Sequence, residues 1–452
     1  MRLACVDHYF EQDIEALEAA SGNHRCFSID YQPFLELARG FFHEEVFTGI
    51  EAYFRPEHAD ARAAYRKAID RELDRLQAVY CFDALLAPSD TFFWIRSLIE
   101  AAQARGIPFV VLQKEATIPP GWLEGPAREW GEISPFIADH MLVSSEHHKA
   151  FWVNSGVRPE QITVTGQPRF DIYAQRGQSP VRSGEMPTVL FLTYDENAYL
   201  PIIDRTGLAP WRRMRDETEA VLLDVARRGT ARVLFKAHPQ PAEDQTEHLA
   251  ELAGNPGVEI LDPRGDVRHY ILDADVVVGF QTTALMESLA AGKPTVYTWW
   301  TNEVERYEGD LIPFHRERGA LVVAESPREL QDAIEQGVSP SPRDARALVT
   351  RYLGPIDGKS AERSWNELER LVAMAEPARV PARGLRAAAA VGSAIAAATW
   401  TAVTVLAPLS YSGYKLLRRA RGGTVLARPD FEEQLALRRG RAVQRLIAAS
   451  TR

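Results

Sequence analysis

Two successive series of short apolar runs, separated by longer helical stretches, constrain the fold of this chain more than any other feature. The first series begins with a short run at the N-terminus and continues at 83–87, 107–112, 140–143 and 162–164. The second comprises runs at 188–192, 232–236, 258–261, 275–278, 295–297 and 320–324. Continuous apolar runs are typical of buried parallel strands, and their alternation with helices predicts a parallel sheet covered on both faces.

Helical spacing lies between these runs, at 91–105, 146–154, 211–228, 243–253, 265–273 and 283–291, with two more helices expected over 326–374. The break near 175–187 is rich in Gly, Ser and Pro and predicts an interdomain linker. We therefore predict an α/β protein with two Rossmann-like domains, over 1–174 and 186–376. Such domains form a cleft in which ligands meet the carboxyl ends of the strands.

Composition excludes some classes of protein. The formal net charge of −10 argues against a nucleic-acid partner, because nucleic-acid proteins usually carry a broad basic face. Three cysteines, all in the first fifth of the chain, indicate reduced intracellular thiols rather than a disulfide framework. The N-terminus has no long apolar region like that of a signal peptide, so we expect a cytoplasmic enzyme domain.

Three motifs follow predicted strands. The first, over 166–171, has the sequence Gly-Gln-Pro-Arg-Phe-Asp. Gly166 permits a sharp exit from the strand and Pro168 stiffens the next step, which would project the guanidinium of Arg169 toward a phosphate or carboxylate. A structural turn in which Arg169 pairs with Asp171 is an equally good interpretation.

The second motif ends a buried strand with Lys236, Ala237, His238 and Pro239. Side chains alternate along a strand, so Lys236 and His238 are predicted to point to the same side at the cleft. Lys236 could offset phosphate charge there, and His238 could donate to a phosphate or assist proton transfer. The alternative is a solvated or capping histidine.

The third motif, over 276–294, runs from a strand through Gly279 and a short polar loop into a helix. Thr282 or Thr283 is predicted to cap that helix, whose free amides and positive dipole end could hold a phosphate. Glu287 lies about one turn inside, where it could reach a ribose. The alternative is an ordinary helix with Glu287 on its surface.

These three motifs, in this order, resemble those of bacterial cell-envelope glycan enzymes with the GT-B glycosyltransferase fold. The similarity covers roughly 140–300 and is greatest to CDP-glycerol glycerophosphotransferases and capsule Kdo-type transferases. UDP-N-acetylglucosamine 2-epimerases share the architecture. The resemblance implies that the donor nucleotide is bound by Arg169, Lys236, His238, Gln281, Thr282, Thr283 and Glu287.

The first half is expected to bind the acceptor and to supply a base. Its candidates are Lys114 and Glu115 after a strand, Asp7 or His8 after the first strand, and Asp90. We predict Glu115 and His238 as catalytic residues, although solvated loop carboxylates are as good an interpretation for each acid. Residues 117–121 are predicted to form a mobile loop. Glycerophosphotransferases use a histidine in this half, and no counterpart is evident in the sequence, which favours sugar transfer.

The resemblance implies metal-independent chemistry, because enzymes of the GT-B fold stabilise the leaving nucleotide with a helix N-terminus and basic side chains. We expect no metal and no cofactor besides the nucleotide-activated donor, which is a substrate. His147 and His148 are interpreted as the solvated start of a helix rather than as metal ligands.

The last part of the chain differs from the rest. No charged residue occurs from Ala387 to Tyr414, and arginines or lysines lie on both sides of this stretch. Roughly 20 apolar residues in a helix cross a bilayer, so the stretch could span the membrane, lie on its surface or pack on the protein. The basic residues favour a membrane-associated tail over 383–452, at the inner face of the cell membrane.

The sequence thus predicts a transferase that moves a sugar from a nucleotide-activated donor to a cell-envelope or lipid-linked glycan acceptor. A polyol-phosphate transferase using a CDP-linked donor is the first alternative. A UDP-sugar 2-epimerase and a non-catalytic GT-B scaffold are the others.

Overall fold

A computed structural model of the chain describes residues 1–114, 117–175, 186–196, 211–238, 243–300, 307–337 and 341–375. Both sheets of the structure belong to one compact unit, which comprises Met1–Leu73 and Phe82–Ala378. The second unit comprises Asp74–Cys81 and Arg379–Arg452, and most of its described residues form the end of helix α5 (Ala59–Tyr80). The predicted tail over 383–452 lies outside the described residues.

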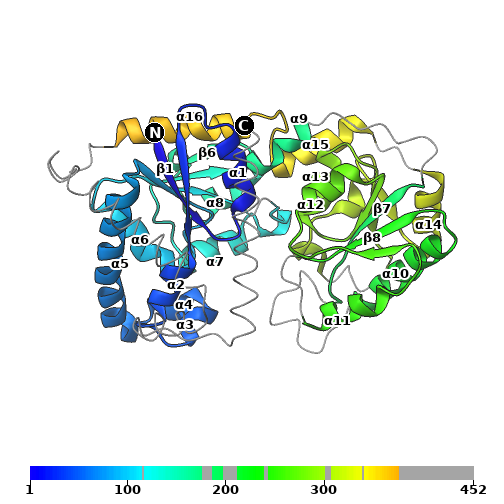
Figure 1. Cartoon of the computed structure of the whole chain (residues 1–452), viewed down its shortest axis with the longest axis horizontal. Coiled ribbons are helices and arrows are strands. Elements are labelled where there is room, and N and C mark those ends of the chain that lie inside the picture. The colour runs from blue at the N-terminus through cyan, green and yellow to red at the C-terminus, as the bar shows by residue number, and fades with distance from the viewer. Residues whose placement is uncertain are drawn as a thin grey trace, which may run out of the picture. The chain divides into compact units, whose positions relative to one another are not determined.

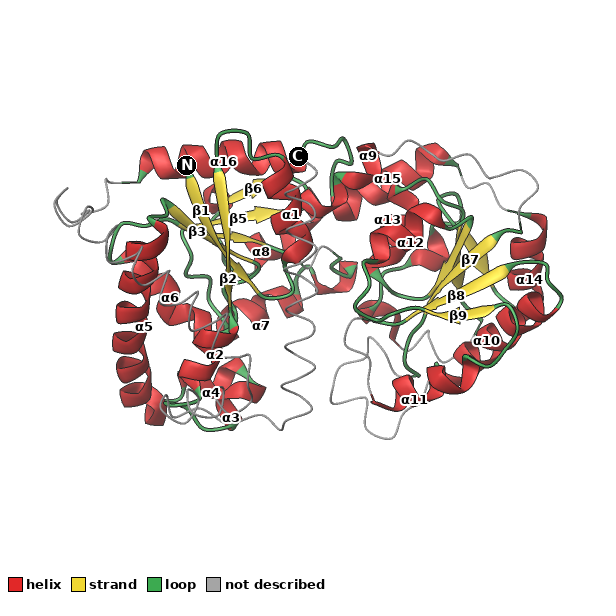
Figure 2. Cartoon of the chain, in the orientation of Figure 1, coloured by secondary structure: helices red, strands yellow, loops and turns green. Residues whose placement is uncertain are grey.

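The first sheet has six parallel strands in the order β2-β1-β3-β4-β5-β6 (Figure 2). The strand order reverses between β1 and β3, so the carboxyl ends of these two neighbouring strands form a topological switch point. The strands are β1 (Arg2–Asp7), β2 (Arg25–Asp30), β3 (Ala84–Ala87), β4 (Phe109–Leu112), β5 (His140–Val143) and β6 (Ile162–Val164). The helices of this half, besides α5, are α1 (Glu11–Ala19), α2 (Gln32–Ala38), α3 (Glu45–Thr48), α4 (Ile50–Phe54), α6 (Phe93–Gln103), α7 (Gly125–Ile133), α8 (Glu146–Asn154) and α9 (Ile172–Gln175).

The second sheet also has six parallel strands, in the order β12-β11-β10-β7-β8-β9. Counted from β7, this is the 3-2-1-4-5-6 order of dinucleotide-binding sheets, with its switch point between β7 and β10. The strands are β7 (Thr188–Leu192), β8 (Arg232–Lys236), β9 (Val258–Ile260), β10 (Val276–Gly279), β11 (Thr295–Thr298) and β12 (Val322–Ala324). The helices are α10 (Arg212–Arg227), α11 (Glu243–Leu252), α12 (Val267–Asp273), α13 (Thr283–Ala290), α14 (Pro327–Gln336), α15 (Pro342–Leu353) and α16 (Ser360–Met374).

The last described helix, α16, packs on the first sheet and not on the second. Its Trp365 and Leu368 are buried in one apolar cluster with Leu3 and Cys5 of β1. The Trp365 indole Nε1 donates to the carbonyl of Leu17 in α1 at 2.9 Å. Figure 1 shows α16 beside β1 and α1, although β1 and α1 are the first elements of the chain and α16 is the last described one.

The structure confirms the predicted pair of parallel α/β sheets, and every predicted strand is present. Strand β2 was not predicted, because its side chains are mostly exposed at the sheet edge and the apolar run is weak. The prediction of two helices over 326–374 is wrong, since α14, α15 and α16 lie there. The predicted domain boundaries stay a prediction, although α16 falls within 186–376 and packs in the first half.

Within the described residues, no helix is long and apolar enough to cross a membrane.

Candidate functional site

The β10–α13 turn places a helix N-terminus at the switch point of the second sheet. Thr282 is the N-cap of α13, and its hydroxyl accepts a hydrogen bond from the amide of Ala284 at 3.3 Å. Thr283 begins the helix, so the predicted capping position is confirmed at the first of the two threonines. The Leu285 amide donates to the Thr282 carbonyl at 3.1 Å, and the positive end of the helix dipole favours an anion such as a phosphate.

Gln281, between strand and cap, has a structural task that its sequence position did not indicate. It is buried and its backbone lies in the left-handed region, with φ at +40°. Its amide nitrogen donates to the Tyr297 hydroxyl and the Ile312 carbonyl, at 2.9 and 2.8 Å, and its oxygen accepts from the Ile312 amide at 3.0 Å. The side chain therefore holds the 307–312 segment against the β10–α13 turn.

Glu287 is buried on α13, so the alternative of a surface carboxylate is wrong. The Tyr173 hydroxyl donates to its Oε2 at 2.7 Å. Burial raises the pKa of Glu287, while the charge of Arg169 and the Tyr173 hydrogen bond oppose that rise. Tyr173 belongs to α9, the helix that follows the 166–171 motif. The carboxylate of Glu287 is consequently held close to that motif.

Arg169 pairs with Asp13 of α1 instead of Asp171. The Asp13 carboxylate, 1% exposed, accepts from the Arg169 amide at 3.0 Å and lies 3.5 Å from its guanidinium. Another guanidinium nitrogen donates to the carbonyl of Lys114 at 2.7 Å. Asp171 instead accepts from the amides of Ser360 and Ala361 and thereby caps α16.

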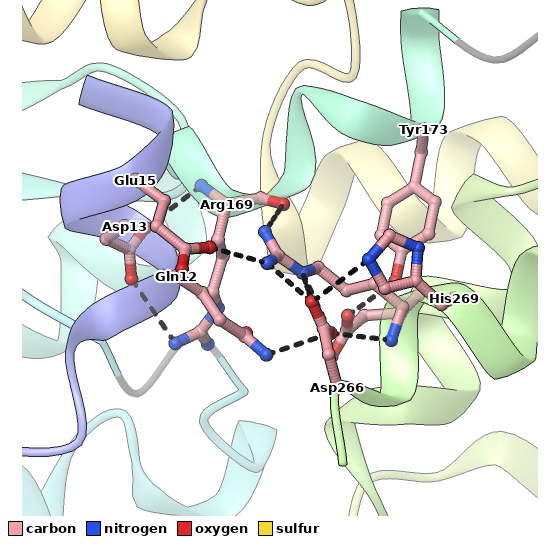
Figure 3. A network of polar contacts seen from close by, with 9 residues as sticks. Gln12, Asp13, Glu15, Arg169, Tyr173, Asp266 and His269 are labelled. Atoms are coloured by element: carbon pink, nitrogen blue, oxygen red, sulfur yellow. Dashed lines mark hydrogen bonds and ion pairs between the residues drawn. The ribbon is translucent and has the colours of Figure 1, made fainter. Parts of the chain in front are cut away.

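A second charged pair continues this network, which Figure 3 shows from close by. Asp266 caps α12 and binds the guanidinium of Arg268, with contacts of 2.7–3.0 Å. Arg268 also donates to the carbonyl of Arg169 at 3.3 Å, and the Gln12 amide donates to Asp266 at 3.0 Å. Helix α1 of the first half is thus bonded both to the 166–171 turn and to α12.

The two residues of the Lys-Ala-His-Pro motif have different surroundings. Lys236 is buried at the end of β8, and its ammonium donates to the carbonyls of Ala237 and Pro263 at 2.9 and 2.7 Å. Burial lowers its pKa, and the nearby carboxylates of Asp262 and Asp266 oppose this. His238 is exposed just beyond the strand. Their predicted roles at a phosphate stay predictions, as does the cleft between the halves.

A cavity of about 870 Å³ lies at the carboxyl ends of the first sheet, beside the switch point between β1 and β3. Its lining is mostly aromatic and apolar, with several hydrogen-bonding groups, a composition typical of ligand sites. The residues are His8, Tyr9, Pro88, Ser89, Thr91, Phe92, Gln113, Lys114, Ile118, Trp122, Pro126, Trp130, His148, Phe151, Trp152 and Asp310.

His8 and Lys114, two candidates from the sequence, line this cavity. The imidazole of His8 lies among the rings of Tyr9, Tyr31 and Phe92, with centroids 4.4–4.9 Å away. Burial, and secondarily the charge of Lys114, lowers the pKa of His8 to about 4. The imidazole is therefore neutral near pH 7.

His147 and His148 lie at the start of a helix as predicted, but the predicted solvation is wrong for His148, which is fully buried and lines the cavity. Its Nδ1 lies 3.2 Å from the Ser144 hydroxyl. His147 is half-buried, with Nε2 2.8 Å from the carbonyl of Ile118. Burial lowers the pKa of His148 to about 3. The signal was available, since His148, Phe151 and Trp152 follow the spacing of one helix face.

The other candidate acids are not among the residues that line the cavity. Asp7 accepts from the Phe10 amide and the Ser28 hydroxyl, at 3.3 and 3.2 Å. Asp90 is buried next to the cavity, accepts from the Ile137 amide at 3.0 Å, and has its pKa raised to about 6 by burial. Glu115 lies outside the described residues.

The segment after Lys114 connects the cavity with α13. The Thr117 hydroxyl lies 2.9 Å from that of Thr283, and the next residue, Ile118, lines the cavity. Trp122 lines it too, and its indole donates to Asp310 at 3.0 Å. The predicted mobile loop over 117–121 and the adjoining Trp122 therefore contact two segments of the second half.

Sequence reasoning missed Asp13, Gln113, His148, Trp130 and Trp152. Asp13 occupies the same helix face as Ile14 and Leu17, all three buried, so an acid in an apolar stripe was its signal. Gln113 follows β4 directly, a position at which polar residues meet a ligand. Trp152 shares the helix-face spacing of His148, whereas Trp130 gave no signal beyond its residue type. Among the described residues, no group of three acids, histidines or cysteines could hold a metal ion.

No protein-family model matches the sequence, and comparison with curated proteins gives no match. Among solved structures, the chain is similar to the UDP complex of MnaA from S. aureus, with 12% identity over 84% of this chain and 100% of that one, and a TM-score of 0.47. It is also similar to a UDP-GlcNAc 2-epimerase from Neisseria meningitidis bound to UDP-GlcNAc, with 13% identity over 82% of this chain and 100% of the other (TM-score 0.46). A third is the calicheamicin glycosyltransferase CalG4, with 15% identity over 83% and 99% of the two chains (TM-score 0.45).

Proposed function

We propose that this protein is a GT-B-type glycosyltransferase, which binds a nucleotide-activated sugar at the β10–α13 turn and transfers the sugar to an acceptor in the cavity of the first sheet. The observation that carries the proposal is the Thr117–Thr283 contact, 2.9 Å between hydroxyls. It places the capped N-terminus of α13 next to a segment that lines the cavity. Donor phosphate and acceptor would then meet at residues 117–118.

Each part of the reaction has a group suited to it. The positive N-terminal end of α13 would stabilise the negative charge that develops on the leaving nucleotide, which requires no metal. His8, neutral and at the cavity wall, would take the proton of the acceptor hydroxyl as the new glycosidic bond forms. Lys236, His238 and Glu287 would bind the donor, as predicted from the sequence, and Glu115 is a second candidate base.

The setting of the reaction is proposed from the tail. The uncharged stretch over 387–414, with basic residues on both sides, would hold the enzyme at the inner face of the cell membrane, near a lipid-linked acceptor. Removing the chain from Ala387 onward should release the protein from membranes. A truncated protein that still sediments with membranes would contradict this part of the proposal.

The donor is tested by thermal unfolding in the presence of UDP-, CMP- and CDP-linked compounds. A ligand at a hundred times its Kd stabilises the folded protein by about 2.7 kcal/mol, so a true donor raises Tm. Stabilisation by CDP-glycerol alone would replace sugar transfer with polyol-phosphate transfer. No stabilisation by any donor would refute the proposal and leave a scaffold.

The acceptor half is tested separately. His8→Gln should keep the donor-induced rise in Tm and lose transfer by at least about a hundredfold, the usual contribution of a general base. His43→Gln, at an exposed histidine, is the control and should retain both. Conversion of a UDP-sugar to its 2-epimer without an acceptor would support the epimerase alternative. Transfer by the His8 variant at the native rate would exclude His8 as the base.

A further inference from the structure

The cavity of the first sheet contains an unusual concentration of unsatisfied polar atoms. Five lining residues have a buried side-chain nitrogen without a hydrogen-bond partner among the described residues: His8, Gln113, Trp130, His148 and Trp152. Gln113, His148 and Trp152 are at most 6% exposed. Buried polar groups are normally paired, because an unpaired one destabilises the folded protein, so their clustering in one cavity indicates a ligand.

The chemistry of these atoms restricts the ligand. The Gln113 amide nitrogen and the two indole nitrogens can only donate, so the ligand must present several acceptor oxygens. The two imidazoles are neutral near pH 7, because burial lowers the pKa of His8 to about 4 and that of His148 to about 3. They can donate or accept, as a hydroxyl does.

The charge of the lining is balanced. Lys114 supplies one positive charge, and its ammonium lies 5.4 Å from the centroid of the Tyr9 ring. Asp310 supplies one negative charge and accepts from the Trp122 indole. A strongly charged ligand would lose its hydration and find no matching set of opposite charges in the cavity, and that loss costs free energy. A neutral ligand is therefore the better fit.

The walls favour a flat, partly apolar ligand. Tyr9 is 55% exposed and lines the cavity. Its φ of +54° is a strained backbone position for a tyrosine, of the kind found at ligand sites. Phe92, Trp122 and Phe151 add further aromatic surface. Such rings contact the C–H face of a sugar, while donors bind its oxygens.

We infer that this cavity binds a neutral saccharide of one or two pyranose rings, with a ring face against Tyr9 and with Gln113, Trp130 and Trp152 hydrogen-bonded to its oxygens. The inference deepens the proposed function, because it names the class of acceptor. Binding would need neither the donor nor the β10–α13 turn. The volume of about 870 Å³ accommodates more than one ring.

The experiment measures binding in the absence of any nucleotide, by tryptophan fluorescence and ligand-observed NMR on the full chain. The probes are neutral methyl hexopyranosides and neutral disaccharides, compared with methyl glucuronide, glycerol 3-phosphate and geraniol. We expect saturable binding of at least one neutral saccharide and none of the charged or hydrocarbon probes. Preferred binding of glucuronide, glycerol phosphate or geraniol would overturn the inference, and so would no binding at all.

Variants then assign the binding to the cavity. Trp130→Phe and Gln113→Leu each remove one donor, and each should weaken binding about threefold to tenfold. Tyr9→Ala should weaken it through loss of the ring. Trp300→Phe is the matched control, since its indole donates to Glu217 outside the cavity, and it should bind as the native protein does. Denaturant unfolding shows that each variant is folded.

The result is separable from the test of the proposed function. Saccharide binding without any donor-induced rise in Tm would refute the transferase proposal and leave the saccharide site intact. A donor-induced rise in Tm without saccharide binding would refute this inference alone. Native affinity in Trp130→Phe and Gln113→Leu would also overturn it, because the unsatisfied nitrogens would then have no part in binding.

Discussion

At the scale of single residues, the most informative groups are polar side chains buried in the first half. Asp13 is compensated, because its carboxylate accepts from the amide and guanidinium of Arg169 and from the Gln167 amide. Burial raises its pKa and the charge of Arg169 opposes the rise. His148 has a hydroxyl partner at Nδ1 and none among the described residues at Nε2. Five residues with an uncompensated atom line the cavity, whereas the compensated carboxylate of Asp13 joins α1 to the 166–171 turn.

The buried His148 should make stability depend on pH. Its pKa is about 3 in the folded protein and near 6.5 when unfolded, so the unfolded chain binds the extra proton between these values. Stability should thus fall as pH drops below about 6.5, by about 1.4 kcal/mol per pH unit from this residue. His148→Phe should remove that contribution in denaturant unfolding measured at pH 7 and pH 5.

The control for this prediction is His43→Gln, at an exposed histidine, which should keep the native pH dependence. Other buried histidines contribute to the total slope, so the comparison is between variants and not with zero. A His148→Phe protein that loses stability in acid as steeply as the native protein would contradict the prediction.

At the scale of elements, the ends of helices decide where ligands can bind. Thr282 on α13 and Ser326 on α14 are both side-chain N-caps, each accepting a hydrogen bond from a first-turn amide. Of these two helices, α13 is the one that begins at the switch point of the second sheet. Each cap should therefore stabilise its own helix in the same way, whereas the Thr282 cap alone of the two is expected to contribute to donor binding.

Replacing either cap tests this difference. Thr282→Ala and Ser326→Ala should each lower the free energy of unfolding by about 1 kcal/mol, because a first-turn amide loses its partner. Only Thr282→Ala should also reduce the Tm rise caused by a nucleotide-activated donor. Equal donor responses in the two variants, measured by thermal unfolding, would place the donor away from α13.

At the scale of the whole molecule, the chain returns at its last described helix to the sheet with which it began. Trp365 and Leu368 of α16 complete the core around Leu3 and Cys5, and Asp171 caps the same helix through Ser360 and Ala361. Residues far apart in sequence therefore share one core. The stability of the first sheet should depend on the last described helix.

Trp365→Ala measures this dependence. A buried tryptophan replaced by alanine costs about 3–5 kcal/mol, and the indole bond to Leu17 is lost as well. Hydrogen exchange should show faster exchange at β1 than at β8, because α16 packs on the first sheet. Asn366→Ala, on the exposed face of α16, should change neither strand. Equal loss of protection in both sheets would contradict the assignment of α16 to the first core.

The sequence by itself determined the two series of parallel strands, because a strand buried on both faces must be apolar throughout and its run ends at breakers. It also narrowed the α13 cap to Thr282 or Thr283, since a cap needs only its own neighbours in sequence. Tertiary structure decided the partners of charged residues: Arg169 with Asp13, Asp171 with α16, and Glu287 with Tyr173. It also gathered His8, Gln113, His148 and the tryptophans around one cavity. Such contacts depend on which strand ends become neighbours in the folded sheet, and local spacing does not encode that order.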